Sequence, residues 1–240
     1  MRRVLQEDHH VHSVFSDDAV STLAENITAA AAAGLTVVRL VEHVRASTDW
    51  VPDFVAAVAA ASVPAGLTVL TGVEAKILDT AGHLDLPALP DGIDSIVMAD
   101  HQFPGPDGPW SPSTTRARLE DGFPVEHALD LLTEGLIGAM HRFPGNQLAH
   151  CFSILPKTGL SEQQLGGERL GAWARAAAQT HTIIEVNEKW ACPGPEALRA
   201  ARSAGARLVA STDSHDARDV GRYDRVARIL DTADDGTVRA

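Results

Sequence analysis

The stretch Asp8-His9-His10-Val11-His12-Ser13-Val14-Phe15-Ser16-Asp17 decides how this chain of 240 residues folds and where its chemistry lies. Residues two apart in a β-strand point to the same face, so His10 and His12 should present two imidazoles side by side at a strand's carboxyl end, as a chelating pair. His9 has the opposite parity. Asp17, after a short turn, could give an oxygen ligand to the same metal ion or a neighbouring one. A lone His-x-His is as often a buried, hydrogen-bonded pair, so the rest of the chain must decide.

The composition excludes several classes of protein. The 45% hydrophobic fraction argues against disorder, and the length suits one α/β domain spanning residues 1–240. A formal charge of −12 opposes a long nucleic-acid footprint and favours a small substrate. No apolar run is long enough to cross a bilayer, the first seven residues do not resemble a signal peptide, and two cysteines do not make a disulfide framework. We therefore expect a cytoplasmic protein without membrane contacts, and the sequence indicates no particular oligomeric state.

Short apolar segments alternate with alanine-rich helical segments along the chain. Strands are predicted at Val4–His12, Thr36–Val41, Thr68–Val73, Ser95–Ala99, Gln147–Cys151, Thr182–Val186 and Arg207–Ser211. Helices are predicted at Ser21–Ala33, Trp50–Ala61, Val125–Glu134, Ser161–Gln179, Pro195–Ala204 and Arg218–Thr232. Alternation of this kind implies that the strands pair in parallel.

The segment Gln102–Gly122 interrupts the alternation, because it holds four prolines and three glycines and shows little periodicity. It is predicted to be a long loop. Loops of this length are often active-site lids, so we expect it to cover the mouth of the site, with Phe103 and Trp110 shaping substrate choice.

Acids and histidines recur where the predicted strands end. They are Glu42-His43, Glu74, Asp100-His101, His150, Glu185 with Asn187, and Asp213 with His215. In a closed parallel barrel these ends converge on one face, whereas structural polar residues would scatter over helix surfaces and both ends of the strands. Nitrogen and carboxylate oxygen donors without cysteine favour zinc, manganese or iron, and so many ligands suit two or three divalent ions better than one.

In this order the motifs resemble those of the polymerase-and-histidinol-phosphatase (PHP) family. The resembling motifs are Asp8-x-His10-x-His12-Ser13-x-x-Ser16-Asp17, Glu42-His43, Gly72-Val73-Glu74, His101, His150, Glu185-x-Asn187 and Ser211-Thr212-Asp213-Ser214-His215. The resemblance spans Asp8 to His215. It implies a distorted seven-stranded (β/α) barrel with a trinuclear metal centre, a fold used by histidinol phosphatases, other small-molecule phosphatases and polymerase-associated exonucleases.

The resemblance also assigns roles to individual residues. One metal ion would be held by His10, His12, Glu74 and Asp213, a second by bridging Glu74 with His101 and His150, and a third by Asp17, His43 and His215. Glu74, Asp213 and His215 are the implied catalytic residues, and Asp8, Glu42, Glu185 and Asn187 would support the ligands. Three positions depart from the family pattern: Glu42 replaces the usual Asp before the histidine, Asp18 the usual Gly after Ser-Asp, and Cys151 the usual Pro after the fifth-strand histidine.

The chemistry that follows is hydrolysis. A water molecule shared by two cations is acidified toward neutral pH and supplies a bridging hydroxide as nucleophile. Side chains near the motifs that could contact a phosphate are Arg45, Lys76, His83, Arg142, Lys189 and Arg218. The leading prediction is a metal-dependent phosphomonoesterase acting on a small phosphorylated metabolite, with histidinol phosphate as one candidate.

Three other functions stay open on the sequence. A phosphodiesterase or nuclease would want a basic groove, although a short nucleotide would not need a long one. A C–N or C–O hydrolase is possible because an activated water also attacks carbonyl carbon. A regulatory metal-binding barrel without turnover is the least favoured, because the full ligand set is present.

Overall fold

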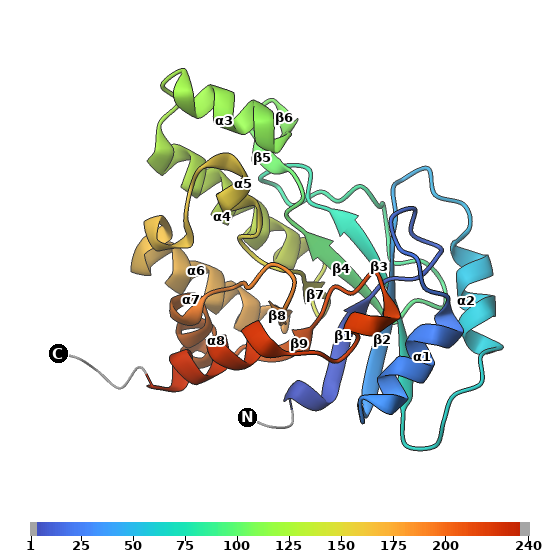
Figure 1. Ribbon diagram of the computed structural model, residues 1–240. Coiled ribbons are helices and arrows are strands. Elements are labelled where there is room, and N and C mark those ends of the chain that lie inside the picture. Colours follow the sequence, from blue (N-terminus) through green and yellow to red (C-terminus); the bar gives the residue numbers. More distant parts are fainter. Residues whose placement is uncertain (1–3, 236–240) are drawn as a thin grey trace.

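Seven parallel strands form a sheet that is nearly closed into a barrel, with helices outside it (Figure 1). The computed structural model describes residues 4–235. The barrel strands are β1 (Glu7–Val11), β2 (Val37–His43), β3 (Thr68–Lys76), β4 (Ser95–Ala99), β7 (Gln147–Leu148), β8 (Ile183–Asn187) and β9 (Arg207–Ser211). Their order in the sheet follows the chain, and each neighbouring pair is parallel. This is the distorted seven-stranded (β/α) barrel that the sequence predicted.

Most of the helices pack their apolar sides against the outside of the barrel, whereas the helix α3 lies beside the strands β5 (Phe103–Gly105) and β6 (Gly108–Trp110) (Figure 1). The helices are α1 (Leu23–Ala32), α2 (Val51–Ala59), α3 (Pro112–Glu120), α4 (Val125–Arg142), α5 (Ile154–Thr158), α6 (Gly166–Gln179), α7 (Pro195–Ala204) and α8 (Asp224–Asp235), with short 3-10 turns η1 (Val4–Gln6), η2 (Glu162–Leu165) and η3 (Ala217–Asp219). Thr22 and Glu25 form a capping box that starts α1, and Gly205 ends α7 in a left-handed conformation. No helix between residues 4 and 235 is both long and apolar enough to span a membrane.

The first and last strands meet at a seam that a side chain closes. The buried Asp8 carboxylate accepts hydrogen bonds from Thr212 N (2.9 Å), Thr212 Oγ1 (2.6 Å) and Gly221 N (3.1 Å). The backbone adds one bond across the seam, from His12 N to Ser214 O at 2.8 Å. Burial raises the pKa of Asp8 to about 6, against the opposing effect of these donors. Asp8 therefore joins the first strand of the barrel to the segment after the last one, two residues before His10.

The segment predicted as a loop at 102–122 is instead a hairpin followed by a helix. Strands β5 (Phe103–Gly105) and β6 (Gly108–Trp110) pair antiparallel and lead into α3. The Phe103 and Trp110 rings stack with their centroids 6.1 Å apart and are 0% and 4% exposed, so they belong to the core. Pro104 and Pro109 face each other across the hairpin, at a pair where neither residue has a backbone donor to offer.

Two glycines make room for this hairpin. A Cβ on Gly105 would lie 2.1 Å from the Trp110 ring, and one on Gly135 of α4 would lie 2.8 Å from Pro104. Prolines and glycines give this segment little periodicity in sequence, but in the structure Pro104 and Gly105 are packed residues of the hairpin. The prediction of an unstructured connection was wrong for this reason.

Several predicted boundaries also move. The first strand begins at Glu7, because residues 4–6 form η1, the fifth ends at Leu148, and α4 continues eight residues beyond its predicted end. The predicted helix at 218–232 is α8, shifted to 224–235. Gly221, with φ of 71°, turns the backbone after η3, so the helix starts later. The Glu188 carboxylate accepts hydrogen bonds from the free backbone amides of Arg225 and Val226 at the start of α8, both at 2.8 Å.

Candidate metal centre

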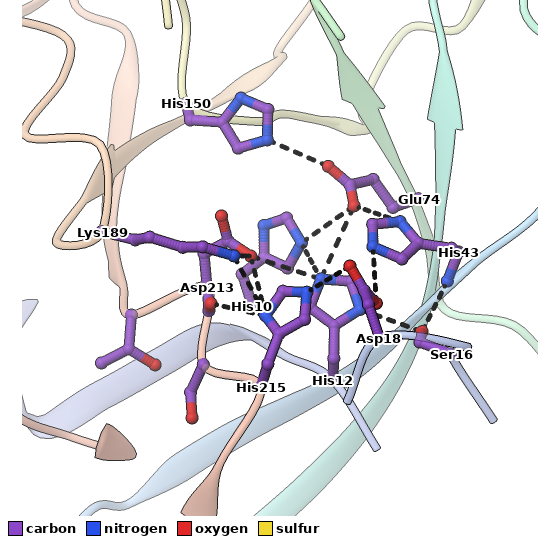
Figure 2. A network of polar contacts seen from close by, with 12 residues as sticks. His10, His12, Ser16, Asp18, His43, Glu74, His150, Lys189, Asp213 and His215 are labelled. Carbon is purple, nitrogen blue, oxygen red and sulfur yellow. Dashed lines mark hydrogen bonds and ion pairs between the residues drawn. The ribbon is translucent and has the colours of Figure 1, made fainter. Parts of the chain in front are cut away.

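Three groups of possible metal ligands gather where the strands end (Figure 2). In each group the ligand atoms lie within 4.8 Å of one another, and the groups are His10, His12 and Asp213; Glu74, His101 and His150; and His12, His43 and His215. The side chains come from β1, β2, β3 and the segments after β4, β7 and β9. Sequence-distant residues predicted to share one face of the barrel do so.

Glu74 lies at the middle of this cluster. Its Oε1 is 3.0 Å from His150 Nε2 and 3.2 Å from His101 Nε2, and its Oε2 is 2.9 Å from His43 Nδ1 and 3.5 Å from His10 Nε2. Burial would raise the pKa of Glu74, but the His101 and His10 charges hold it well below its usual range. Oε2 is buried and accepts no hydrogen bond of good geometry. A buried anionic oxygen of this kind fits direct contact with a cation.

The His10 and His12 side chains also fit a cation. Glu185 Oε2, an acceptor, lies 3.0 Å from His10 Nδ1, so Nδ1 donates. Ser16 Oγ donates to Glu42 Oε2 (2.7 Å) and therefore accepts from His12 Nδ1 (3.1 Å). In their neutral, metal-binding form the two rings would face each other with Nε2 lone pairs at 2.9 Å, a repulsive arrangement that a bound cation would remove.

His150 is oriented in the same way. Ser153 Oγ donates to Asp100 Oδ1 at 2.9 Å and lies 3.1 Å from His150 Nδ1, from which it accepts. Burial would lower the pKa of His150, but Asp100 and Glu74 raise it to about 10. Such outer partners fix the ring orientation of metal-binding histidines.

The other predicted supporting residues lie around this ring of histidines. Asn187 Nδ2 donates to Glu185 Oε1 at 2.6 Å and so orders the carboxylate that holds His10. Burial raises the pKa of Glu42 to about 7, although Ser13 and Ser16 oppose the shift. Neither Ser153 nor Ser16 stands out in the sequence as a hydroxyl link between a histidine and a carboxylate.

Asp18, not Asp17, has its carboxylate against the histidines. Both aspartates are exposed, line the adjoining cavity and belong to none of the three groups. Asp18 Oδ2 lies 3.2 Å from His215 Nε2 and its Oδ1 lies 3.5 Å from His43 Nε2. The turn after Ser16 thus brings the second carboxylate, at the position of a family departure, against the histidines.

A cavity of about 270 Å³ opens beside the cluster. Three of the predicted phosphate contacts, Arg45, Lys76 and Lys189, line it. Lys189 Nζ lies 3.2 Å from His215 Nδ1 and 3.6 Å from Asp213 Oδ1. A larger cavity of about 690 Å³ adjoins it and shares Lys189, Asp213 and His215.

The other three predicted phosphate contacts lie outside both cavities. His83 Nδ1 is 2.8 Å from Asp79 Oδ2, and Arg142 Nε donates to Ala81 O at 3.5 Å. Arg218 pairs with Asp216 and is mostly exposed. Their proximity in sequence to the ligand motifs did not bring them to the site, because His83 and Arg218 turn toward partners on their own segments and Arg142 turns toward the backbone of Ala81.

The family model of the PHP domain matches residues 8–189. This chain belongs to the PHP domain family. The PHP chain is 27% identical to two proteins named probable phosphatases, from Acetivibrio thermocellus and Clostridium acetobutylicum, over 239 residues that cover 95% of this chain and 86% of each relative. A crystal structure of histidinol phosphate phosphatase from Lactococcus lactis, complexed with zinc, L-histidinol and phosphate, has the same fold, with a TM-score of 0.63 at 16% identity over 97% of this chain and 94% of that one.

Proposed function

We propose that this PHP protein is a metal-dependent phosphomonoesterase acting on a small phosphorylated metabolite. The observation that carries the proposal is the Glu74 carboxylate, buried among imidazole nitrogens with one oxygen lacking a hydrogen bond. Relatives named probable phosphatases over nearly the whole chain support the reaction class.

The donors suit two or three divalent ions of zinc, manganese or iron. One ion would be held by His10, His12, Glu74 and Asp213. A second would share Glu74 and add His101 and His150. A third would use His43 and His215, with Asp18 replacing Asp17 as the carboxylate. Bound ions would supply the Lewis acidity that activates water for hydrolysis near neutral pH.

The chain's own residues would orient the phosphoryl group. Lys189, whose ammonium lies against His215 and Asp213, is placed to contact a phosphoryl oxygen at the border of the two cavities. Arg45, just after β2, and Lys76, at the end of β3, also line the smaller cavity and add positive charge there. A phosphate dianion among carboxylates needs this compensation, and such contacts lower the barrier when they strengthen in the transition state.

The larger cavity would take the alcohol part of the ester. Its lining is almost wholly polar, with Val20 as the apolar exception, which favours a polar alcohol. Histidinol phosphate is one such substrate, and the Lactococcus enzyme of the same fold was crystallised with L-histidinol and phosphate.

A substrate panel with manganese and with zinc tests the proposal. Release of inorganic phosphate is measured from histidinol phosphate and sugar phosphates, and formation of the cleavage products is measured by chromatography for a dinucleotide and for amide or ester substrates of the same size. We expect turnover of at least one phosphate monoester, lost on chelation and restored by metal. Turnover of the dinucleotide alone would support a phosphodiesterase, turnover of an amide or ester alone would support a C–N or C–O hydrolase, and no turnover with a full metal complement would support a binding protein.

A further inference from the structure

The indole of Trp190 gives the two carboxylate oxygens of Asp213 different partners. Trp190 Nε1 donates to Asp213 Oδ2 at 2.7 Å. Asp213 Oδ1 faces the cluster, 3.4 Å from His12 Nε2 and 3.6 Å from Lys189 Nζ. One oxygen is therefore occupied by the indole, and the other is directed to the histidines.

Trp190 is itself held in place from two sides. Its backbone amide donates to Asn187 Oδ1 at 2.9 Å, and Asn187 bonds the Glu185 carboxylate that holds His10. The ammonium of Lys157 lies 3.7 Å from the centre of the indole ring. The indole N–H thus has a defined direction, linked through two side chains to another candidate ligand.

The apolar core does not account for a tryptophan at this position. Trp190 is 38% exposed and forms a wall shared by the metal cavity and a separate cavity of about 520 Å³, whereas Trp173 is fully buried. Asp213, by contrast, is 4% exposed and has φ of 53°, in the left-handed region. Its Oδ2 accepts the indole N–H, so the partly exposed indole has its polar partner in a buried carboxylate.

We propose that Trp190 is a positioning residue that keeps Asp213 a one-oxygen ligand. With its N–H on Oδ2, only Oδ1 is free to join His10 and His12 on one metal ion. The inference rests on the proposed metal centre but not on phosphatase activity. Loss of an outer hydrogen bond of this type lowers metal affinity about ten- to a hundredfold.

Zinc titration against a chromophoric chelator tests this role. Trp190→Phe keeps an aromatic ring and removes the N–H, and we expect it to bind zinc about tenfold or more weakly at one class of site. Trp190→His, which retains a ring N–H, should recover part of the affinity. Trp50→Phe is the matched control, because Trp50 packs on Phe15 and Phe54 away from the ligands, and should match the parent protein.

Tryptophan fluorescence gives a second readout, which in the parent protein needs no substitution at Trp190. Zinc should change the emission of the parent protein and of Trp50→Phe in step with saturation, and the change should be absent from Trp190→Phe. Parent-like zinc affinity in a folded Trp190→Phe variant would overturn the proposal. If Trp190→Phe fails to fold, an emission that zinc leaves unchanged in the parent overturns it instead. Failure of the parent to bind zinc, manganese or iron would overturn the metal centre itself, a separate result.

Discussion

The histidine cluster and the aromatic pair Phe103 and Trp110 of the hairpin are both largely buried, but they are built on opposite principles. In the cluster the buried atoms are polar, and most nitrogens and oxygens have one specific partner, as His10 has Glu185. In the hairpin the buried groups are aromatic rings, and Phe103 stacks on Trp110, which meets Phe123 edge to face at 5.3 Å. Directional polar contacts tolerate little substitution, whereas apolar packing tolerates changes that conserve volume. Activity should therefore depend on the first region and stability on the second.

The strongest test of this separation is Glu74→Ala. The variant should lose turnover by about a thousandfold or more, because metal chemistry supplies several kcal/mol of transition-state stabilisation. Circular dichroism should show a retained barrel, and elemental analysis should show fewer ions than the two or three expected in the parent. Glu7→Ala, which removes a carboxylate from the opposite end of β1, is the control for activity. Near-parent kcat with a full metal complement in Glu74→Ala would contradict the assignment of Glu74 as the shared ligand.

The complementary test is the substitution Trp110→Ala in the hairpin. Truncation of this buried ring should lower the free energy of unfolding by about 3–5 kcal/mol, through lost burial and the cavity left behind. The folded fraction should keep its metal content and kcat. Denaturant unfolding measures the loss, and Trp110→Phe should cost less because it keeps most of the packing. A large change in KM with little change in stability would instead support the lid that the sequence predicted.

A narrower comparison sets Asp18 against Asp17. Asp18→Ala should weaken binding of one ion by about tenfold or more, because its carboxylate lies against His43 and His215. Asp17→Ala removes the same charge one residue earlier and should bind metal like the parent. Isothermal titration with zinc distinguishes them. The opposite ranking would restore Asp17 to the ligand set.

The smallest expected effect concerns the cations of the smaller cavity. Lys189→Ala should lose about tenfold in kcat/KM, equivalent to ~1.4 kcal/mol, and Arg45→Ala less, because the Lys189 ammonium lies against His215 and Asp213. Inorganic phosphate should inhibit Lys189→Ala less than the parent. Arg218→Ala is the control, because Arg218 pairs with Asp216 outside the cavity. Unchanged kcat/KM and phosphate inhibition in both cavity variants would mean that the metal ions alone bind the phosphoryl group.

Periodicity predicted the parallel strands and the pairing of His10 with His12, whereas the closed seven-stranded barrel and the division of the ligands into groups came from the resemblance to the PHP family. The two-residue repeat of a strand places His10 beside His12, with rings 4.8 Å apart, and leaves His9 to pair with Glu7. Parallel strands bring Glu74 and His150 to the same end although they are 76 residues apart. These relations depend on regular geometry, which a sequence pattern carries.

The parts that were missed depend on irregular backbone. The choice between Asp17 and Asp18 is made in a turn, where no repeat fixes which side chain points inward. The partnership of Trp190 with Asp213 joins two loops 23 residues apart, and no sequence spacing marks it. His83, Arg142 and Arg218 were expected near the site because of their neighbours in the chain, but the direction of an exposed side chain follows its own hydrogen bonds, here to Asp79, Ala81 and Asp216.

The hydrogen bonds between Asp8 and Thr212 also determine when the barrel can close during synthesis of the chain. Asp8 and Thr212 are separated by 204 residues, so the barrel cannot close until Thr212 has left the ribosome. Of the proposed ligands, His10 and His12 emerge first, and Asp213 and His215 emerge last, directly after Thr212. At the proposed metal centre the early pair of histidines alone would hold an ion only loosely. Tight binding of that ion would begin with the same late residues that close the barrel.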